Sequence, residues 1–471
     1  MCRKLLFLLL SSLLVFNNCA LHKVEEQIEP PPQTPERFTI SGTATPPDTW
    51  WASFHQPELN QVVDSALGSN LELRIAWSRL RQFRATARRV NTSPSVDLNA
   101  SGQRGRSFFN FGGQPITFTN NDFNLDASAS YEVDLWKRLS SLDKAEALQV
   151  KASREDAEAT ALALAGNLTR TWFALAAQRE QKELLLRQVE TNQKFVTVLE
   201  TRFANALAGA VEVFQARRQL AAIESQIPNT EARIATLSNA LAVLSGQAPR
   251  GESYPAAKAL PALPPLPATG IPADLLRNRP DIRAAGARIA AADHQLAAAI
   301  AARYPSLRLT GSTGYSSADF ADLLDNWIWR IAGSILAPII DGGARKAEAE
   351  RARAVVEERV VQYQQTMLRG LQEVEDALAL ERGQKAFIAE LEEQLSVARE
   401  AYDAGRRRYL EGVGDFLTVL TETQAVQQIE QEMVRARSDL IANRINLYQA
   451  LGGGWTVSLP EPGNGVEGDQ P

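Results

Sequence analysis

The stretch from Asp122 to Trp136 alternates strictly between polar and apolar residues, and this pattern constrains the fold more than any other. Odd positions from Phe123 to Leu135 are apolar, whereas even positions from Asp122 to Asp134 are polar or acidic. A period of two places these sets on opposite faces of a β-strand. A strand between lipid and water has this pattern, and so does a half-buried strand of a soluble sheet.

Three other segments alternate in the same way, over residues 95–101, 306–312 and 327–335. A loop rich in Gly, Phe and Asn, from Arg104 to Asn121, is expected to join the first strand to the second. A loop containing Asp319, Asp322 and Asp325 is expected to join the third to the fourth. The sequence therefore predicts four strands in two hairpins with long outer loops.

Long helical runs surround these strands. A run from Pro57 reaches Val90, and another, interrupted only by Gly166, extends from Lys137 to about Thr201, or roughly 95 Å as a helix. A turn at residues 205–211 precedes a helix back to Leu244. Later runs cover 280–304, 344–404 and, after a turn at 405–415, the chain to Leu451. Coiled-coil seams are expected at Val189, Asn192, Val196, Leu199 and Phe203, and at Ile388, Leu391, Leu395, Ala398 and Tyr402.

The plan repeats once along the chain. Arg202-Phe203 and Arg408-Tyr409 stand 206 positions apart, as do Gly246 and Gly452. We predict a tandem duplication. The expected boundaries are a signal peptide at 1–18, a Pro-rich extended leader at 19–49, a first repeat at 50–248, a linker at 249–271, a second repeat at 272–454 and a flexible tail at 455–471.

The N-terminus has the features of an export signal, with Arg3 and Lys4 before an apolar stretch from Leu5 to Phe16. Cys19 follows where a bacterial lipoprotein carries its lipidated cysteine, although the residues before it match that motif poorly, and plain cleavage near this point is the alternative. The net charge of −5 disfavours nucleic acid as a partner.

Four strands cannot close a membrane barrel, because single-chain barrels have about eight or more. Open strand edges cannot face lipid either. Three copies would supply twelve strands around a polar lumen. We therefore expect a mainly α fold with a small membrane β part, in which long coiled-coil-like helices form an α-barrel and four strands per chain join a trimeric 12-stranded β-barrel.

Several motifs occur in a specific order: Trp50-Trp51 with Phe54 and Pro57-Glu58-Leu59; Tyr131 to Trp136; Arg279-Pro280-Asp281-Ile282-Arg283; Tyr304-Pro305-Ser306; Pro338 with Asp341-Gly342-Gly343; and Gly412 to Leu420. In this order the chain resembles the TolC/OprM-like outer-membrane efflux proteins, in their NodT-type lipoprotein branch. The resemblance covers about Trp50 to Gly454. It implies a homotrimeric, passive exit duct of a tripartite RND-type system, which carries drugs or small solutes and docks onto a periplasmic adaptor and an inner-membrane pump.

The resemblance also implies roles for particular residues. The periplasmic tip, as gate and adaptor contact, would comprise Arg202, Phe203, Asn205, Ala206, Leu207, Arg408, Tyr409, Gly412, Val413, Gly414, Asp415 and Phe416. From the strand alternation, the lumen would be lined by Asp122, Asn124, Asp126, Glu132, Arg308 and Arg330, and lipid would meet Phe123, Leu125, Tyr131, Trp327, Trp329 and Ile331.

Two positions depart from the family pattern. Ala206 stands where relatives often have Gly, and Thr421 stands where they often have an acidic residue that helps to ring the closed pore. No catalytic, metal-ligand or cofactor motif is evident, so we expect neither an enzyme nor a cofactor. The competing hypotheses are the channel of a type I protein secretion system and, from another class, a soluble periplasmic coiled-coil adaptor or scaffold.

Overall fold

The computed structural model describes residues 21–24, 35–44, 49–90, 95–249, 251, 254 and 259–461. Its contacts divide the chain into two units. The strand unit contains Leu80–Ser153 and Ala284–Tyr363, and the helical unit contains Arg154–Arg283 and most of the remainder. Two long helices, α4 (Arg138–Ala204) and α9 (Ala344–Leu410), continue through the boundary between them. The predicted signal peptide, Cys19 and Pro94 lie outside the described residues.

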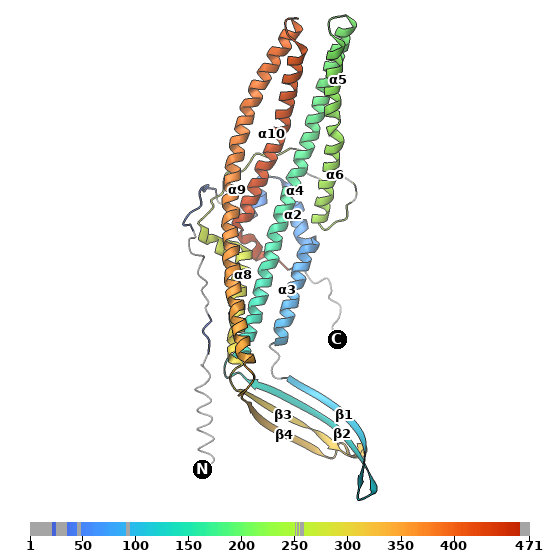
Figure 1. Cartoon of the computed structure of the whole chain (residues 1–471), viewed down its shortest axis with the longest axis vertical. Helices are drawn as coiled ribbons and strands as arrows, with labels where there is room; N and C mark the ends of the chain where they lie inside the picture. The colour runs from blue at the N-terminus through green and yellow to red at the C-terminus, as the bar shows by residue number, and fades with distance from the viewer. Residues whose placement is uncertain are drawn as a thin grey trace. The chain divides into compact units, whose positions relative to one another are not determined.

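Four antiparallel strands form one sheet in the order β1-β2-β3-β4, with bounds Ser95–Phe111, Gln114–Val133, Ser306–Ser317 and Trp327–Leu336 (Figure 1). The predicted loop from Arg104 to Asn121 was wrong. β1 and β2 remain paired up to Phe111 and Gln114, and the hairpin turns at Gly112-Gly113, whose φ values of 61° and 84° are typical of a tight turn. The second loop is shorter and holds a single 3-10 turn, η4 (Phe320–Asp322).

Each hairpin leads into a long helix through an aspartate cap. Asp134 accepts hydrogen bonds from the backbone N–H groups of Leu139 and Ser140 at 2.9 and 2.8 Å. Burial raises the pKa of Asp134, but these bonds and that of the Ser140 hydroxyl outweigh it and lower the pKa overall. Asp341 caps α9 similarly by accepting from Gly343 N at 3.0 Å. Asp134 is therefore a helix cap and does not belong to the polar strand face.

The helices of each repeat are stacked end to end. In the first repeat, α2 (Pro57–Ser69) and α3 (Leu71–Val90) are separate helices that break at Asn70, so the predicted single helix was wrong. Asn70 Nδ2 donates to Leu244 O at 2.8 Å, at the end of α6 (Gln226–Leu244). Gly246 lies close to Ser69 O with a φ of 71°, where a side chain would clash.

The second repeat makes an equivalent junction. Gly453 N donates to Asn278 O at 3.3 Å, and Arg279 Nη1 donates to Ala450 O at 3.1 Å. This joins the end of α10 (Phe416–Leu451) to η3 (Pro272–Asp274), α7 (Leu275–Asn278) and α8 (Pro280–Ala301). The two junctions are equivalent points of the predicted tandem repeat.

The core of the helical unit explains the aromatic motif near the start of the chain. Trp50 and Trp51 lie in η2 (Trp50–Phe54) and are 2% exposed. Trp50 stacks on Tyr448 with ring centroids 5.4 Å apart, and Trp51 meets Trp455 of η5 (Gly454–Ser458) at 4.9 Å. The motif therefore joins the N-terminal segment to the end of the second repeat.

Part of the leader is packed, contrary to the prediction of a wholly extended segment. Phe38 is 8% exposed, Ala44 forms a parallel bridge with Pro267, and Thr39 N donates to Glu375 Oε1 at 2.9 Å. The leader thus pairs with the connection between the two repeats. Backbone groups of short polar segments are stabilised by this kind of pairing, which composition alone does not reveal.

Among the helices in the described part of the chain, none combines the length and the apolar character needed to cross a bilayer.

Candidate functional site

The register of the sheet sorts its side chains onto two faces. Directly paired residues share a face, and Leu125 pairs with Ala100 and Tyr315, while Tyr315 pairs with Trp327. We call this the apolar face. It carries every strand residue that the sequence assigned to lipid, namely Phe123, Leu125, Tyr131, Trp327, Trp329 and Ile331.

The opposite face, which we call the polar face, carries every residue that the sequence assigned to a lumen, namely Asp122, Asn124, Asp126, Glu132, Arg308 and Arg330. Glu132 accepts a bond from Arg138 Nη2 at 2.7 Å and lies 3.9 Å from Arg308 Nη2. Asn99 Nδ2 donates to Asp126 Oδ1 at 3.4 Å. In the part of the chain that is described, no cluster of His, Cys, Asp or Glu has a metal-binding arrangement.

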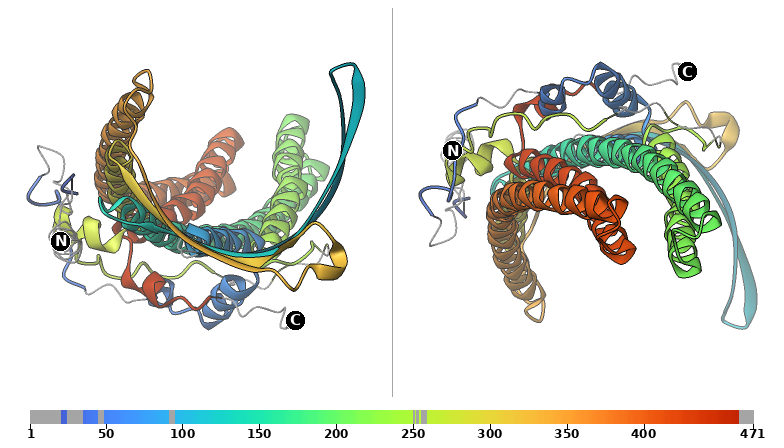
Figure 2. Two further views of the ribbon diagram at one scale, coloured as in Figure 1. Left: turned by 90° about the horizontal axis from the view of Figure 1, so that it is seen from below. Right: turned by 90° about the horizontal axis from the view of Figure 1, so that it is seen from above.

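The apolar face is broadly exposed within one chain. Ile331 is 79% exposed, Leu98 77% and Val96 73%. Figure 2 shows that the four strands form one curved sheet. A contiguous apolar patch of this kind is rare on a soluble monomer and marks contact with lipid or another chain.

The second candidate site is the pair of helix turns at the tip of the helical unit, between α4 and α5 (Ala210–Glu224) and between α9 and α10 (Figures 1 and 2). Both long helices end in the same motif. Leu207 N donates to Arg202 O at 2.8 Å, and Val413 N donates to Arg408 O at 3.0 Å. The residue immediately before the donor has a positive φ in each turn, 59° at Ala206 and 75° at Gly412. These are Schellman caps.

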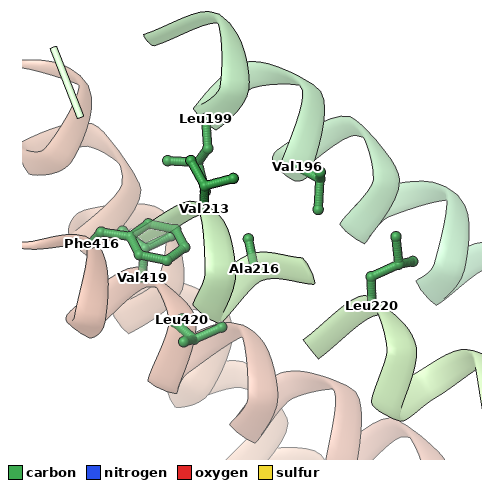
Figure 3. Packing of buried hydrophobic residues seen from close by; sticks show 8 residues of the cluster. All are labelled: Val196, Leu199, Val213, Ala216, Leu220, Phe416, Val419 and Leu420. Atoms are coloured by element: carbon green, nitrogen blue, oxygen red, sulfur yellow. The ribbon is translucent and has the colours of Figure 1, made fainter. Parts of the chain in front are cut away.

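A buried cluster behind the turns holds the tip together. It comprises Val196, Leu199, Val213, Ala216, Leu220, Phe416, Val419 and Leu420, from α4, α5 and α10 (Figure 3). The seam prediction is confirmed for Val196 and Leu199, but Phe203 is 49% exposed and lies outside the cluster. The turn predicted at 405–415 was also too long, because α9 continues to Leu410.

Tyr409 joins the two hairpins of the tip. The Arg202 guanidinium lies 4.9 Å from the centre of its ring, Phe416 meets the ring at 5.7 Å, and its hydroxyl donates to Glu212 Oε2 at 3.1 Å. Burial, followed by the bond to Glu212, raises the pKa of Tyr409. Sequence reasoning missed Glu212, which precedes a buried valine but matches no motif.

The other predicted tip residues differ in role. Asp415 caps α10 by accepting from Leu417 N at 3.0 Å. Gly414 is packed so closely that a Cβ would lie 2.9 Å from Arg408. Asn205 Nδ2 donates to Thr201 O at 2.7 Å. Exposed apolar side chains cover the remaining tip surface: Phe203, Leu207, Val211 and Phe214 on the first hairpin, and Leu410, Val413 and Leu417 on the second.

Thr421, the departure noted in the sequence, lies exposed on α10 and donates to Leu417 O at 2.9 Å. The Thr421 hydroxyl is therefore hydrogen-bonded within its own helix.

Comparison with known proteins identifies the family of the chain that carries these surfaces. A family profile described as outer membrane efflux protein matches residues 62–247 and 271–453, which together make up more than half of the chain. The chain belongs to the outer membrane efflux protein family. Each matched segment contains one hairpin of the sheet, one long helix and the shorter helices of that repeat that stack end to end.

Individual members of the outer membrane efflux protein family match over nearly the whole chain. The pyoverdine export outer membrane protein OpmQ of Pseudomonas putida is 29% identical over 444 residues, 92% of this chain and 94% of its own. The probable outer membrane lipoprotein SilC of Salmonella typhimurium is 26% identical over 96% of this chain and 99% of its own. The structure of the outer-membrane channel OprN superposes with a TM-score of 0.85, at 26% identity, over 93% of this chain and 100% of that one.

The predicted fold class is thus confirmed, as is the assignment to the outer membrane. As a member of this family the chain is a channel component of an efflux system, which decides against the soluble scaffold as an alternative.

Proposed function

We propose that three copies assemble into one passive exit duct through the outer membrane, each supplying four strands. The observation that carries this proposal is the strand order β1-β2-β3-β4, which leaves one edge of β1 and one edge of β4 without a partner strand in the described structure. An unpaired edge is unstable in hydrocarbon, where no water satisfies its backbone groups. Pairing β1 of one copy with β4 of the next removes both edges, and three copies give an even-numbered barrel.

The faces of the sheet then have defined environments. The apolar face meets lipid and the polar face lines the lumen, with Asp126 and Glu132 in water. From Val133 to Phe123 the strand advances by ten residues, or about 34 Å, and a tilt of about 40° reduces this to about 26 Å. That height matches the apolar band of an outer-membrane barrel, which is about 25 Å.

The tip is the contact for a periplasmic adaptor, which links the duct to an inner-membrane pump. Its exposed apolar side chains, such as Leu207 at 65% and Val413 at 67%, are held by rigid caps rather than by flexible loops. Apolar groups in a fixed arrangement can bind a partner without a large entropic cost. The chain itself performs no chemistry in this scheme, and the pump supplies the energy.

The cargo is a small organic solute. OpmQ is described as a pyoverdine export protein, and the polar face here presents dispersed amides, carboxylates and guanidinium groups, which do not form a selective site. Cys19 is the proposed lipid anchor beside the barrel, by analogy with the lipoprotein SilC.

Light scattering of the detergent-solubilised protein tests the assembly. The expected protein mass is three times that of one chain, and pore conductance should appear on insertion into a planar bilayer. A folded monomer that remains in solution without detergent would contradict the proposal.

Co-purification with a periplasmic adaptor from the same organism tests the tip. Val413→Asp should weaken adaptor binding by about tenfold or more, since it places a charge in an apolar contact. Val457→Asp is the control, because Val457 is 56% exposed but lies outside the tip. Equal binding by both variants would place the adaptor contact elsewhere.

A further inference from the structure

Charged side chains are distributed unequally between the two faces of the sheet. By the register, Asp97, Asp122, Asp126, Glu132, Arg308 and Arg330 all lie on the polar face. On the apolar face of the four described strands the only charged side chains are Arg104 and Arg106, which pair with Asn121 and Thr119. Sequence reasoning missed both, because it placed them in a loop.

These two arginines lie on the apolar face beyond Phe123, on the side away from the helices, and the exposed Phe108 follows them on the same face. The Phe123 ring covers Gly102, where a Cβ would lie 3.1 Å from it, and Phe320 meets Phe123 at 5.6 Å. Arg104 follows two residues after Gly102, on the same face and farther from the strand ends that join the helices. The order along the face is therefore apolar band, Phe123, the two arginines and then Phe108.

Both arginines are exposed, and no hydrogen bond or ion pair engages either side chain within the described part of the chain. The neighbouring side chains on the same face of β1 and β2 are Asn121, Thr119, Thr117 and Phe108, none of which is acidic. The two Cα atoms are about 7 Å apart along the strand, so both side chains project to the same side of the hairpin.

We propose that Arg104 and Arg106 bind the phosphate groups of lipids in the outer leaflet of the membrane. The proposal rests on the proposed function, because it requires the apolar face to meet lipid. Immediately beyond the apolar band an outward-facing side chain reaches the headgroup layer, and a guanidinium group binds phosphate oxygens in a bidentate manner. Two such groups on one face fix a phosphate-bearing headgroup against the barrel wall.

Asp122 is near in height but lies on the opposite face, and the next acidic groups lie in the β3–β4 connection. Asp319, Asp322 and Asp325 follow Ser317 and precede Trp327, at the level of Phe123. In a closed ring the β4 edge of one copy adjoins the β1 edge of the next, so an ion pair between copies is the competing use of the arginines. It would stabilise the assembly and leave the lipid unbound.

Native mass spectrometry of the detergent-solubilised full chain tests the proposal. The probe is lipid A with both phosphates, titrated against the wild type, the double variant Arg104→Gln/Arg106→Gln, and the matched double variant Arg308→Gln/Arg330→Gln on the polar face. We expect the first double variant to bind at least about tenfold more weakly and the second to bind as the wild type does, since bonds to charged groups are the strong ones. Lipid A from which both phosphates have been removed should bind all three proteins equally weakly.

Each other outcome overturns the proposal. Equal binding of diphosphorylated lipid A by both double variants would exclude the arginines as its site. Displacement of the lipid by inorganic phosphate at low concentration would assign the site to soluble anions. Loss of the assembled mass in the first double variant, with unchanged lipid binding by the remaining assembly, would assign the arginines to the neighbouring copy. Failure of the wild type to assemble would instead refute the proposed function.

Discussion

Arg444 is the most completely buried charge in the described structure, and its removal gives the clearest prediction for the helical unit. Its side chain is 0% exposed, and it forms two bonds to Glu381, which is 3% exposed, at 2.7 and 2.6 Å. Its remaining nitrogen donates to the carbonyl oxygens of Pro264 and Pro265 at 2.5 and 2.8 Å. One side chain therefore connects α9, α10 and the linker between the repeats.

Arg444→Met should lower the free energy of unfolding by about 3–5 kcal/mol, because it leaves the Glu381 carboxylate buried with only Lys385 as a charged partner. The matched control is Arg435→Met on the same helix. Arg435 forms an exposed pair with Glu432 at 3.5 Å, so its loss should cost less than about 1 kcal/mol.

The double variant Glu381→Leu/Arg444→Met separates the charge from the linker contacts. Removing both charges should restore most of the lost free energy of unfolding, since a buried ion pair adds little stability over apolar packing. The two proline carbonyls remain unpaired, so a deficit of about 1–3 kcal/mol should persist. It should appear as faster proteolysis within residues 259–272.

Thermal loss of helical circular dichroism in detergent measures the stabilities. Equal melting temperatures for Arg444→Met and Arg435→Met would contradict this prediction. A double variant that melts at the same temperature as Arg444→Met would also contradict it. The pH dependence provides a further check. Although burial raises the pKa of Glu381, its bonds to Arg444 and Lys385 lower it overall. The unfolded chain therefore binds the proton more readily, and this stabilisation is lost as the pH falls below about 4.3.

Three further substitutions follow from the structure. Ala206→Gly should stabilise the first tip turn by about 1 kcal/mol, seen as slower hydrogen exchange there, because Ala206 has a φ of 59°. Gly166→Ala should stabilise the helix by less than the usual gain of about 1 kcal/mol, because its Cβ would lie 1.8 Å from the Gln449 amide, which must shift and weaken its bonds to Arg170 and to Leu162 O; a melting temperature that rises by the full gain would refute that contact. Ile331→Asp should block membrane assembly at a cost of about 2 kcal/mol or more per copy, whereas Ile328→Asp on the polar face should assemble normally.

The sequence predicted the two strand faces correctly because alternation depends only on the direction of successive side chains, and the register preserved it from Phe123 to Tyr131. It failed for the outer half of the first hairpin. There the residues from Arg104 to Asn121 place aromatic and polar side chains on both faces, with Phe108 on the apolar face and Phe109 and Phe118 on the polar face. The alternation is therefore lost, and the composition resembles that of a loop.

The tip was predicted only in part. The repeat spacing indicated its two turns, and Gly412 matched the cap it forms. The link between Tyr409 and Glu212 joins residues 197 positions apart, and local patterns carry no signal for such a contact. The same holds for Arg444, whose partners lie 63 and 180 positions away.

Disulfide cross-linking between strand edges tests directly whether β1 of one copy pairs with β4 of another. In a background with Cys19 replaced, Asp97→Cys on β1 is combined in turn with cysteine at each polar-face position of β4, including Arg330 and Ser334. Ser128→Cys/Ser312→Cys, which pairs β2 with β3 inside one chain, is the control. We predict an oxidised ladder that ends at three chains for at least one edge pair, and only single chains for the control. Single chains for every edge pair, from a protein that still folds and inserts, would contradict it.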